Sequence, residues 1–150
     1  MRAEDIMTSP VITVRTDQSV RAAATVLATH DIASAPVVDD GGRVVGMFSE
    51  LDAIRGRLPH DPRNHMIPPA APAADPNAVV SDVMTPVVVC YGPHTDIAHV
   101  ASTMVEQRLR AIPIVDGTNL LGIVSRHDLV RLVARGHDDE IPATHWRPHR

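Results

Sequence analysis

The chain has 150 residues, 44% of them hydrophobic, but its only aromatic residues are Phe48, Tyr91 and Trp146, so the core must be built from aliphatic side chains. Its 14 basic and 18 acidic residues give a net charge of −4, which excludes the strongly basic surface of a nucleic-acid-binding or membrane-surface protein. The single cysteine, Cys90, excludes an internal disulfide. The N-terminus lacks an apolar signal segment and no run approaches the ~20 apolar residues of a membrane span, so we expect a cytoplasmic protein.

The first third of the chain predicts five elements in the order strand, helix, strand, strand, helix. A β-branched run predicts a strand at 11–14, and the polar residues 17–19 can cap a helix that follows. This helix is indicated by apolar residues at the spacing of one helical face: Val20, Ala23, Ala24, Leu27 and Ala28. Two apolar strands, 36–38 and 44–48, flank a Gly/Asp turn as in a hairpin, and a helix is predicted at 50–57.

A proline-rich segment, 58–79, follows and is predicted to be an extended connector, because proline lacks a backbone donor and interrupts helices and central strands. The same five elements are then predicted again. They are a strand at 87–91, a helix with the apolar face Ile97, Val100, Ala101, Met104 and Val105, strands at 113–115 and 120–124, and a helix at 126–135. The polar residues 136–150 are predicted to form a tail.

Three short sequence matches show that these two sets of elements are repeats. Residues 5–8 (DIMT) match 82–85 (DVMT), and 35–39 (APVVD) match 112–116 (IPIVD), both at an offset of 77. The third pair, GMFSELD at 46–52 and GIVSRHD at 122–128, has an offset of 76, because the hairpin turn of the first repeat is one residue longer. The sequence therefore predicts an α/β (α+β) protein with repeats at 1–57 and 80–135. Each β-α-β-β-α repeat is too small to cover its own sheet, so we expect the two to pack with pseudo-twofold symmetry and to form two similar clefts.

The third pair places a glycine, a serine and an aspartate at identical spacing where a strand is predicted to meet a helix. One interpretation is purely structural: Ser49 and Asp52, and likewise Ser125 and Asp128, form caps of the helices that follow. The other is a ligand site, since a serine hydroxyl and free backbone N–H groups suit a phosphate, and an aspartate at a strand end suits paired ribose hydroxyls. In that interpretation Gly46 leaves room for the close approach of a ligand.

The three matched motifs resemble those of CBS domains, the modules named after cystathionine β-synthase, arranged as a tandem pair (a Bateman module). The resemblance covers both repeats and every predicted element in order. It implies paired repeats, dimers of the pair, and regulatory binding of AMP, ADP, ATP or S-adenosylmethionine between the repeats, with signalling to an unidentified protein partner. It implies no required cofactor.

The resemblance also implies which residues bind the ligand. Asp52 and Asp128 would accept the ribose hydroxyls, with Ser49 and Ser125 near the ribose or phosphate. Ile12 and Val89 would flank the adenine, and the phosphate side would be lined by Ala33, Ser34, Arg110 and Ala111. Because Arg126, His127 and Arg110 replace Glu50, Leu51 and Ala33 of the first repeat, we expect the second site to prefer the more highly phosphorylated ligand.

Other functions have less support in the sequence. No phosphate-binding glycine loop is present, and Ser125, His127 and Asp128 on one helical turn cannot form a catalytic triad, so we expect no enzyme. The nine histidines lack metal-ligand spacing, although His60 and His65 leave open a zinc-linked stress response. Cys90 lies among apolar residues and is interpreted as a small core side chain. A dimerisation scaffold without ligand remains the main alternative.

Overall fold

The computed structural model describes residues 1–55, 57–58, 75–86 and 89–137. Most of the predicted connector, including His60 and His65, and the tail from residue 138 onward lie outside the described residues. The chain forms two compact units. Unit 1 contains Met1–Ile12, Gly42–Val44 and Val88–Arg150, and unit 2 contains Thr13–Gly41 and Val45–Val87.

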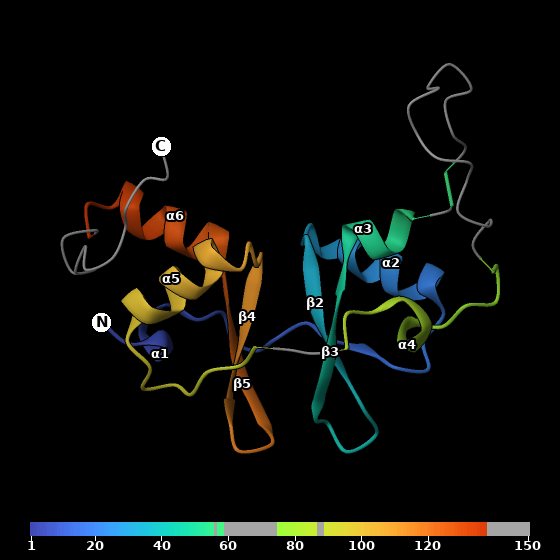
Figure 1. Ribbon diagram of the computed structural model, residues 1–150, viewed down its shortest axis with the longest axis horizontal. Helices are drawn as coiled ribbons and strands as arrows, with labels where there is room; N and C mark the ends of the chain where they lie inside the picture. The colour runs from blue at the N-terminus through green and yellow to red at the C-terminus, as the bar shows by residue number, and fades with distance from the viewer. Residues whose placement is uncertain (56, 59–74, 87–88, 138–150) are drawn as a thin grey trace. The chain divides into compact units, whose positions relative to one another are not determined.

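Unit 2 is built on a small three-stranded sheet of order β1-β2-β3, in which β1 runs parallel to β2 with Val14 opposite Val37. Its elements are β1 (Val14–Arg15), α2 (Val20–His30), β2 (Ser34–Val38), β3 (Val44–Ser49, whose first residue is assigned to unit 1), α3 (Glu50–Ile54) and α4 (Val80–Val83). Helices α2, α3 and α4 accompany the sheet (Figure 1). The fully buried side chains of Val14, Val37, Phe48 and Val80 lie in its core.

Unit 1 contains a two-stranded antiparallel sheet, in which Ala111 of β4 lies opposite Ser125 of β5. Its elements are α1 (Ala3–Ile6), α5 (Ile97–Glu106), β4 (Ala111–Asp116), β5 (Asn119–Ser125) and α6 (Arg126–Ala134). Buried aliphatic residues from α1, α5, β4 and β5 form its core, as predicted from the lack of aromatic residues. The mixture of helices with small sheets confirms the α+β class.

The first strand of each repeat is shorter than predicted. The strand expected at 11–14 is reduced to β1, Val14–Arg15, and the one expected at 87–91 to a single parallel bridge between Tyr91 and Ile114, with residues 87–88 outside the described residues. Pro93 lacks a backbone donor and limits this ladder on the far side of Tyr91. Helix α3 also ends early, at Ile54 instead of residue 57. A glycine and a proline follow within five residues, and both discourage helix continuation.

The two long helices begin and pack as the sequence indicates. Ser19 caps α2 by accepting a hydrogen bond from Ala22 N at 3.0 Å, and Asp96 caps α5 by accepting one from Ala98 N at 2.9 Å. On the predicted apolar face of α2, Val20, Ala23 and Leu27 are buried. The equivalent residues of α5, which are Ile97, Val100 and Met104, are buried as well. The last positions of the two faces, Ala28 and Val105, are exposed.

Each unit is completed by a short helix from the beginning of the other repeat, which the sequence did not reveal. In unit 1 the segment containing α1 pairs with β5 through Thr8 N to Ile123 O (2.8 Å) and Ile123 N to Thr8 O (3.0 Å). In unit 2 the segment containing α4 pairs with β3 through Met47 N to Thr85 O and Thr85 N to Met47 O, both 3.0 Å. Figure 1 shows α1 beside β5 and α4 beside β3. The compact units therefore do not coincide with the sequence repeats.

The motif glycines, Gly46 and Gly122, make this exchange possible. A Cβ atom added to Gly46 would lie 2.6 Å from Met84 Sδ and 2.7 Å from the carbonyl oxygen of Thr85. One added to Gly122 would lie 2.7 Å from Met7 Cγ. The space beside each glycine is thus filled by the exchanged segment of the DIMT or DVMT motif. From the sequence we expected the space beside Gly46 to admit a ligand, but in the structure Met84 and Thr85 fill it.

Among the described helices, none has the length and apolar character needed to cross a membrane.

Replacing Gly46 with alanine should lower the free energy of unfolding by about 1–3 kcal/mol, because the new methyl group meets the backbone of Thr85 and not only a flexible side chain. Gly122→Ala should lower the free energy of unfolding by a smaller amount, because the flexible side chain of Met7 can move. Gly41→Ala is the matched control, because its nearest contact is 3.4 Å away. Urea unfolding of the three variants tests this, and equal losses at Gly41 and Gly46 would contradict it.

Candidate functional site

In unit 2, Ser49 ends β3 and Asp52 lies in the first turn of α3. Asp52 Oδ2 accepts hydrogen bonds from Ser49 N at 2.9 Å and from Ser49 Oγ at 3.0 Å, and Ser49 Oγ accepts one from Asp52 N at 3.4 Å. Among the residues that the structure describes, Asp52 is the only charged one that is buried, with 7% of its surface exposed. The strand-to-helix junction therefore holds this carboxylate in one orientation.

In unit 1, Ser125 and Asp128 repeat this arrangement between β5 and α6. Asp128 Oδ2 accepts from Ser125 N at 2.7 Å and from Ser125 Oγ at 2.8 Å, and Ser125 Oγ accepts from Asp128 N at 3.2 Å. The capping interpretation of both motifs is confirmed.

The caps use only one oxygen of each carboxylate. Among the described residues, no group donates a hydrogen bond to Oδ1 of Asp52 or of Asp128. Capping and ligand binding are therefore compatible, because an ionised carboxylate with a second oxygen to spare remains an acceptor.

The segment before the second strand of each repeat adjoins the same junction. Glu50 N donates to Ala33 O at 2.9 Å in unit 2, and Arg126 N donates to Arg110 O at 3.0 Å in unit 1. Ser34 begins β2, and Ala111 begins β4 opposite Ser125. In both units the structure thus brings together the predicted phosphate-side residues and the Ser–Asp pair.

The guanidinium group of Arg126 is already bonded within unit 1. Its Nε donates to Leu109 O at 2.8 Å and one of its terminal nitrogens donates to Arg108 O at 2.9 Å. These bonds fix the positive charge beside the loop that precedes β4. His127, the next residue of α6, is exposed.

The predicted adenine-flanking residues, Ile12 and Val89, are both partly buried and both lie outside the strands of the described chain. Ile12 belongs to unit 1, which also contains Ser125 and Asp128, and Val89 belongs to unit 1 as well. Their contact with a ligand, and the location of the clefts between the repeats, stay predictions.

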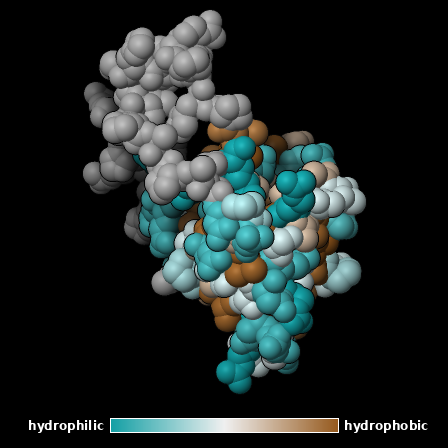
Figure 2. Space-filling view, turned by 90° about the vertical axis from the view of Figure 1, so that its right-hand side faces the viewer, coloured by the Kyte–Doolittle hydropathy of each residue, from teal (hydrophilic) through white to brown (hydrophobic). Residues whose placement is uncertain are grey.

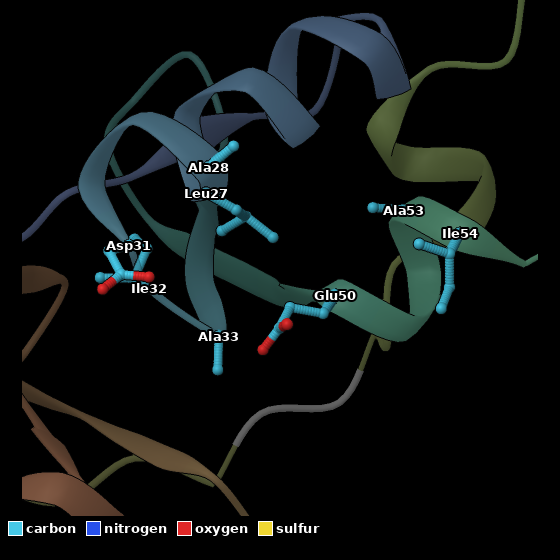
Figure 3. Close-up of a pocket in the computed structure, with 8 residues that line it drawn as sticks. All are labelled: Leu27, Ala28, Asp31, Ile32, Ala33, Glu50, Ala53 and Ile54. Atoms are coloured by element: carbon cyan, nitrogen blue, oxygen red, sulfur yellow. The ribbon is translucent and has the colours of Figure 1, made fainter.

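A pocket of about 330 Å³ lies within unit 2 between α2 and α3 (Figure 3). Its wall is mainly apolar, with two acidic residues, and the lining residues are Leu27, Ala28, Asp31, Ile32, Ala33, Glu50, Ala53 and Ile54. Sequence reasoning assigned a ligand-binding role only to Ala33 among these residues, and only Glu50 lies within a repeated motif, GMFSELD. Asp31 is also unusual in its left-handed backbone conformation (φ 52°), which sequence periodicity does not show.

The other reactive side chains that the structure describes are not grouped into a second site. Burial raises the pKa of the Cys90 thiol, but Cys90 is only partly buried and lies in neither core cluster, so its interpretation as a core side chain is not confirmed. Within the described ranges, no three His, Cys, Asp or Glu residues are grouped so that they could hold a metal ion. The suggested zinc ligands His60 and His65 are outside those ranges.

Ser125→Ala should lower the free energy of unfolding by about 1 kcal/mol, because the first turn of α6 loses its hydroxyl cap. Ser102→Ala is the control, since Ser102 is exposed within α5 and alanine favours helices. Thermal unfolding followed by circular dichroism measures both. If Ser125→Ala were as stable as Ser102→Ala, the capping bond would not contribute to stability.

Comparison with known proteins gives three consistent findings. The family model described as CBS domain matches residues 3–58 and 80–135. The CBS domain-containing protein YhcV of Bacillus subtilis is 32% identical over 84% of the chain and 81% of its own length. The uncharacterized protein MJ1225 of Methanocaldococcus jannaschii is 28% identical over 86% of the chain, which spans only 41% of that longer protein.

Among solved structures, the CBS domain pair of protein MJ0100 is similar, with a TM-score of 0.74 and 26% identity over 91% of this chain and 98% of that one. That pair was crystallised in complex with 5′-methylthioadenosine and S-adenosylmethionine.

Proposed function

The chain belongs to the CBS domain family as a tandem pair, and we propose that it is a regulatory protein that binds an adenosine-containing ligand through Asp52 and Asp128. The observation that carries this proposal is the duplicated junction, in which each carboxylate is fixed by its own cap while Oδ1 takes no hydrogen bond from the described residues. The adenosine compounds bound to the MJ0100 pair support the class of ligand.

The chemistry of the junction suits a ribose. Two adjacent hydroxyl groups need an acceptor that is ionised, held still and not already saturated by hydrogen bonds. A carboxylate whose other oxygen is fixed by two donors from the preceding serine meets these requirements, because it loses little freedom when the ligand binds. A ligand lacking the 2′-hydroxyl should bind more weakly.

The two sites differ in the charge that surrounds the junction. Unit 1 places Arg110 and Arg126 where unit 2 has Ala33 and Glu50. Arg126 donates hydrogen bonds to two backbone carbonyl groups, so it would act on a phosphate mainly through its fixed positive charge. Arg110 would supply a second positive charge. We therefore propose that the site containing Asp128 prefers ligands with more phosphate groups.

The proposed protein is a homodimer that signals to a protein partner by changing conformation when ligand binds. A ligand shifts such a balance only if it binds one state better than the other. A scaffold that dimerises without ligand has the same fold, and it is the alternative that the ligand measurements must exclude. A role without catalysis and a cytoplasmic location stay predictions.

Ligand binding should raise the melting temperature of the protein. S-adenosylmethionine, 5′-methylthioadenosine, AMP, ADP and ATP are the ligands to compare, and a compound at 100 times its Kd should add about 2.7 kcal/mol to the free energy of unfolding. Asp52→Asn and Asp128→Asn should each reduce this gain. Asp82→Asn is the matched control, because Asp82 accepts from Val79 N at 3.0 Å in a similar helix start but lies outside the candidate site. If no adenosine compound changes the melting temperature, the scaffold alternative replaces this proposal.

The preference for phosphate should appear when ATP and AMP are titrated calorimetrically into the two carboxylate variants. Asp52→Asn leaves the site with Arg110 and Arg126, so we expect it to bind ATP at least about tenfold more tightly than Asp128→Asn does, because opposite fixed charges favour the triphosphate. AMP should distinguish the variants less. Equal affinities for ATP in both variants would show that the two sites are equivalent.

A further inference from the structure

The pocket between α2 and α3 lies wholly within unit 2, and the repeat gives each of its residues an equivalent in unit 1. Asp31, which follows α2, is equivalent to Arg108, which follows α5. Both have a left-handed backbone, with φ of 52° and 55°. Glu50, the first residue of α3, is equivalent to Arg126, the first residue of α6. Two acidic residues of the pocket are thus arginines in the other repeat.

The same hydrogen bonds fix the loop after the long helix in both units. Ile32 N donates to Leu27 O at 3.1 Å in unit 2, and Leu109 N donates to Met104 O at 2.9 Å in unit 1. The bonds from the first residue of α3 and of α6 back to this loop are 2.9 and 3.0 Å long. The carbonyl groups of residues 31 and 32 therefore have the same place in unit 2 as those of residues 108 and 109 have in unit 1.

In unit 1 these two carbonyl groups bind a guanidinium group. Nε of Arg126 donates to Leu109 O at 2.8 Å, and a terminal nitrogen of Arg126 donates to Arg108 O at 2.9 Å. The planar fork of a guanidinium group suits two neighbouring acceptors of this kind. The loop after α5 is therefore an acceptor site for a guanidinium group, and α6 supplies that group from within the chain.

Unit 2 has the same acceptors but not this donor, because Glu50 replaces the arginine. In the part of the chain that the structure describes, no group donates a hydrogen bond to the carbonyl oxygens of Asp31 and Ile32. The side chains of Asp31, from the end of α2, and Glu50, from the start of α3, line the pocket as well (Figure 3). Carbonyl oxygens together with two carboxylates favour a cation that has several donors.

The rest of the pocket suits an aliphatic chain. Its volume is about 330 Å³, and side chains such as Leu27 and Ala53 make most of the wall apolar. On α3, Leu51 and Ile54 are 54% and 47% exposed. Figure 2 shows, for one face of the molecule, apolar areas that reach the surface among polar ones. An arginine side chain joins a guanidinium group to an aliphatic stem, and the protein that carries it would also cover exposed apolar residues.

We propose that this pocket binds an arginine side chain of the protein partner, whose guanidinium group takes in unit 2 the place that Arg126 holds in unit 1. The carbonyl oxygens of Asp31 and Ile32 and the carboxylates of Asp31 and Glu50 accept its hydrogen bonds. Its stem lies against Leu27. This inference rests on the protein partner of the proposed function, but not on its adenosine ligand.

The probe for this site is a blocked tripeptide of leucine, arginine and leucine, titrated into isotope-labelled, full-length protein and followed by NMR. We expect the largest shifts at the amides of residues 27–33 and 50–54, with a Kd of about 1 mM or tighter. Peptides with citrulline or lysine at the central position are the controls. Citrulline keeps the shape but not the charge, and lysine keeps the charge but not the planar fork, so both should bind at least about threefold more weakly.

Three substitutions test the pocket itself. Asp31→Asn and Glu50→Gln each remove one carboxylate, and each should weaken binding of the arginine peptide at least about threefold. Asparagine tolerates the left-handed backbone of residue 31. Glu50→Arg installs the residue that begins α6 in the same backbone, so it should fold, fill the pocket and abolish binding. Asp116→Asn, in the exposed β4–β5 hairpin, is the control for loss of one charge and should leave the Kd unchanged.

Circular dichroism checks the folding of each variant. The inference is overturned by the absence of shifts at the pocket with about 10 mM peptide, by equal affinities for the arginine and citrulline peptides, or by undiminished binding to Glu50→Arg. Agmatine that binds as tightly as the peptide would assign the pocket to a small molecule, and peptide affinity that rises on dilution of the protein would assign it to a second copy of this chain. Either result also overturns the inference.

The adenosine ligand is tested separately in the same proteins. Asp31 lies outside the Ser–Asp junction, so Asp31→Asn should keep the rise in melting temperature with adenosine compounds while it loses affinity for the arginine peptide. Failure of the peptide to bind therefore leaves the adenosine proposal standing, and failure of the adenosine compounds leaves the arginine site standing.

Discussion

Packing of a methionine onto a glycine holds each compact unit together. Met84 fills the space beside Gly46 in β3, and Met7 fills the space beside Gly122 in β5. A side chain on Gly46 would press on the backbone of Thr85 and strain its paired bonds with Met47, whereas one on Gly122 would first displace the flexible side chain of Met7. The exchanged helices α4 and α1 also bring the buried residues Val80 and Ala3 into the two cores.

The candidate site depends on this packing indirectly. Each motif glycine lies three residues before the serine that ends its strand. The strand that pairs with the exchanged segment therefore also leads into the Ser–Asp pair. The cap then fixes Oδ2 of the aspartate and orients the other oxygen. One seven-residue motif thereby serves two purposes, since its first residue secures the core and its last presents an acceptor.

The sequence was a good guide wherever the determining contacts are local. Side chains within a few residues of one another determine the helix starts at Ser19 and Asp96, both hairpins and the serine caps. The structure contains all of these features. The exchange of α4 pairs residues about forty positions apart, and that of α1 pairs residues more than a hundred positions apart. A periodic pattern in the sequence does not indicate such pairs. The short first strands and the packing role of Gly46 were missed for the same reason, because both depend on contacts between residues far apart in the sequence. The left-handed conformations of Asp31 and Arg108 were also hidden, because neither residue is glycine.

The exchange of α1 and α4 has a consequence for how such a chain could arise. A solitary ancestral repeat would carry the helix that belongs to a neighbour and lack the one that completes itself, so it would fold only by trading segments with a second molecule. Gene duplication and fusion turn that concentration-dependent encounter into an event within one polypeptide, where the missing piece is always at hand. After fusion the two halves can diverge in charge, as positions 31 and 108 have done, while each continues to supply what the other needs.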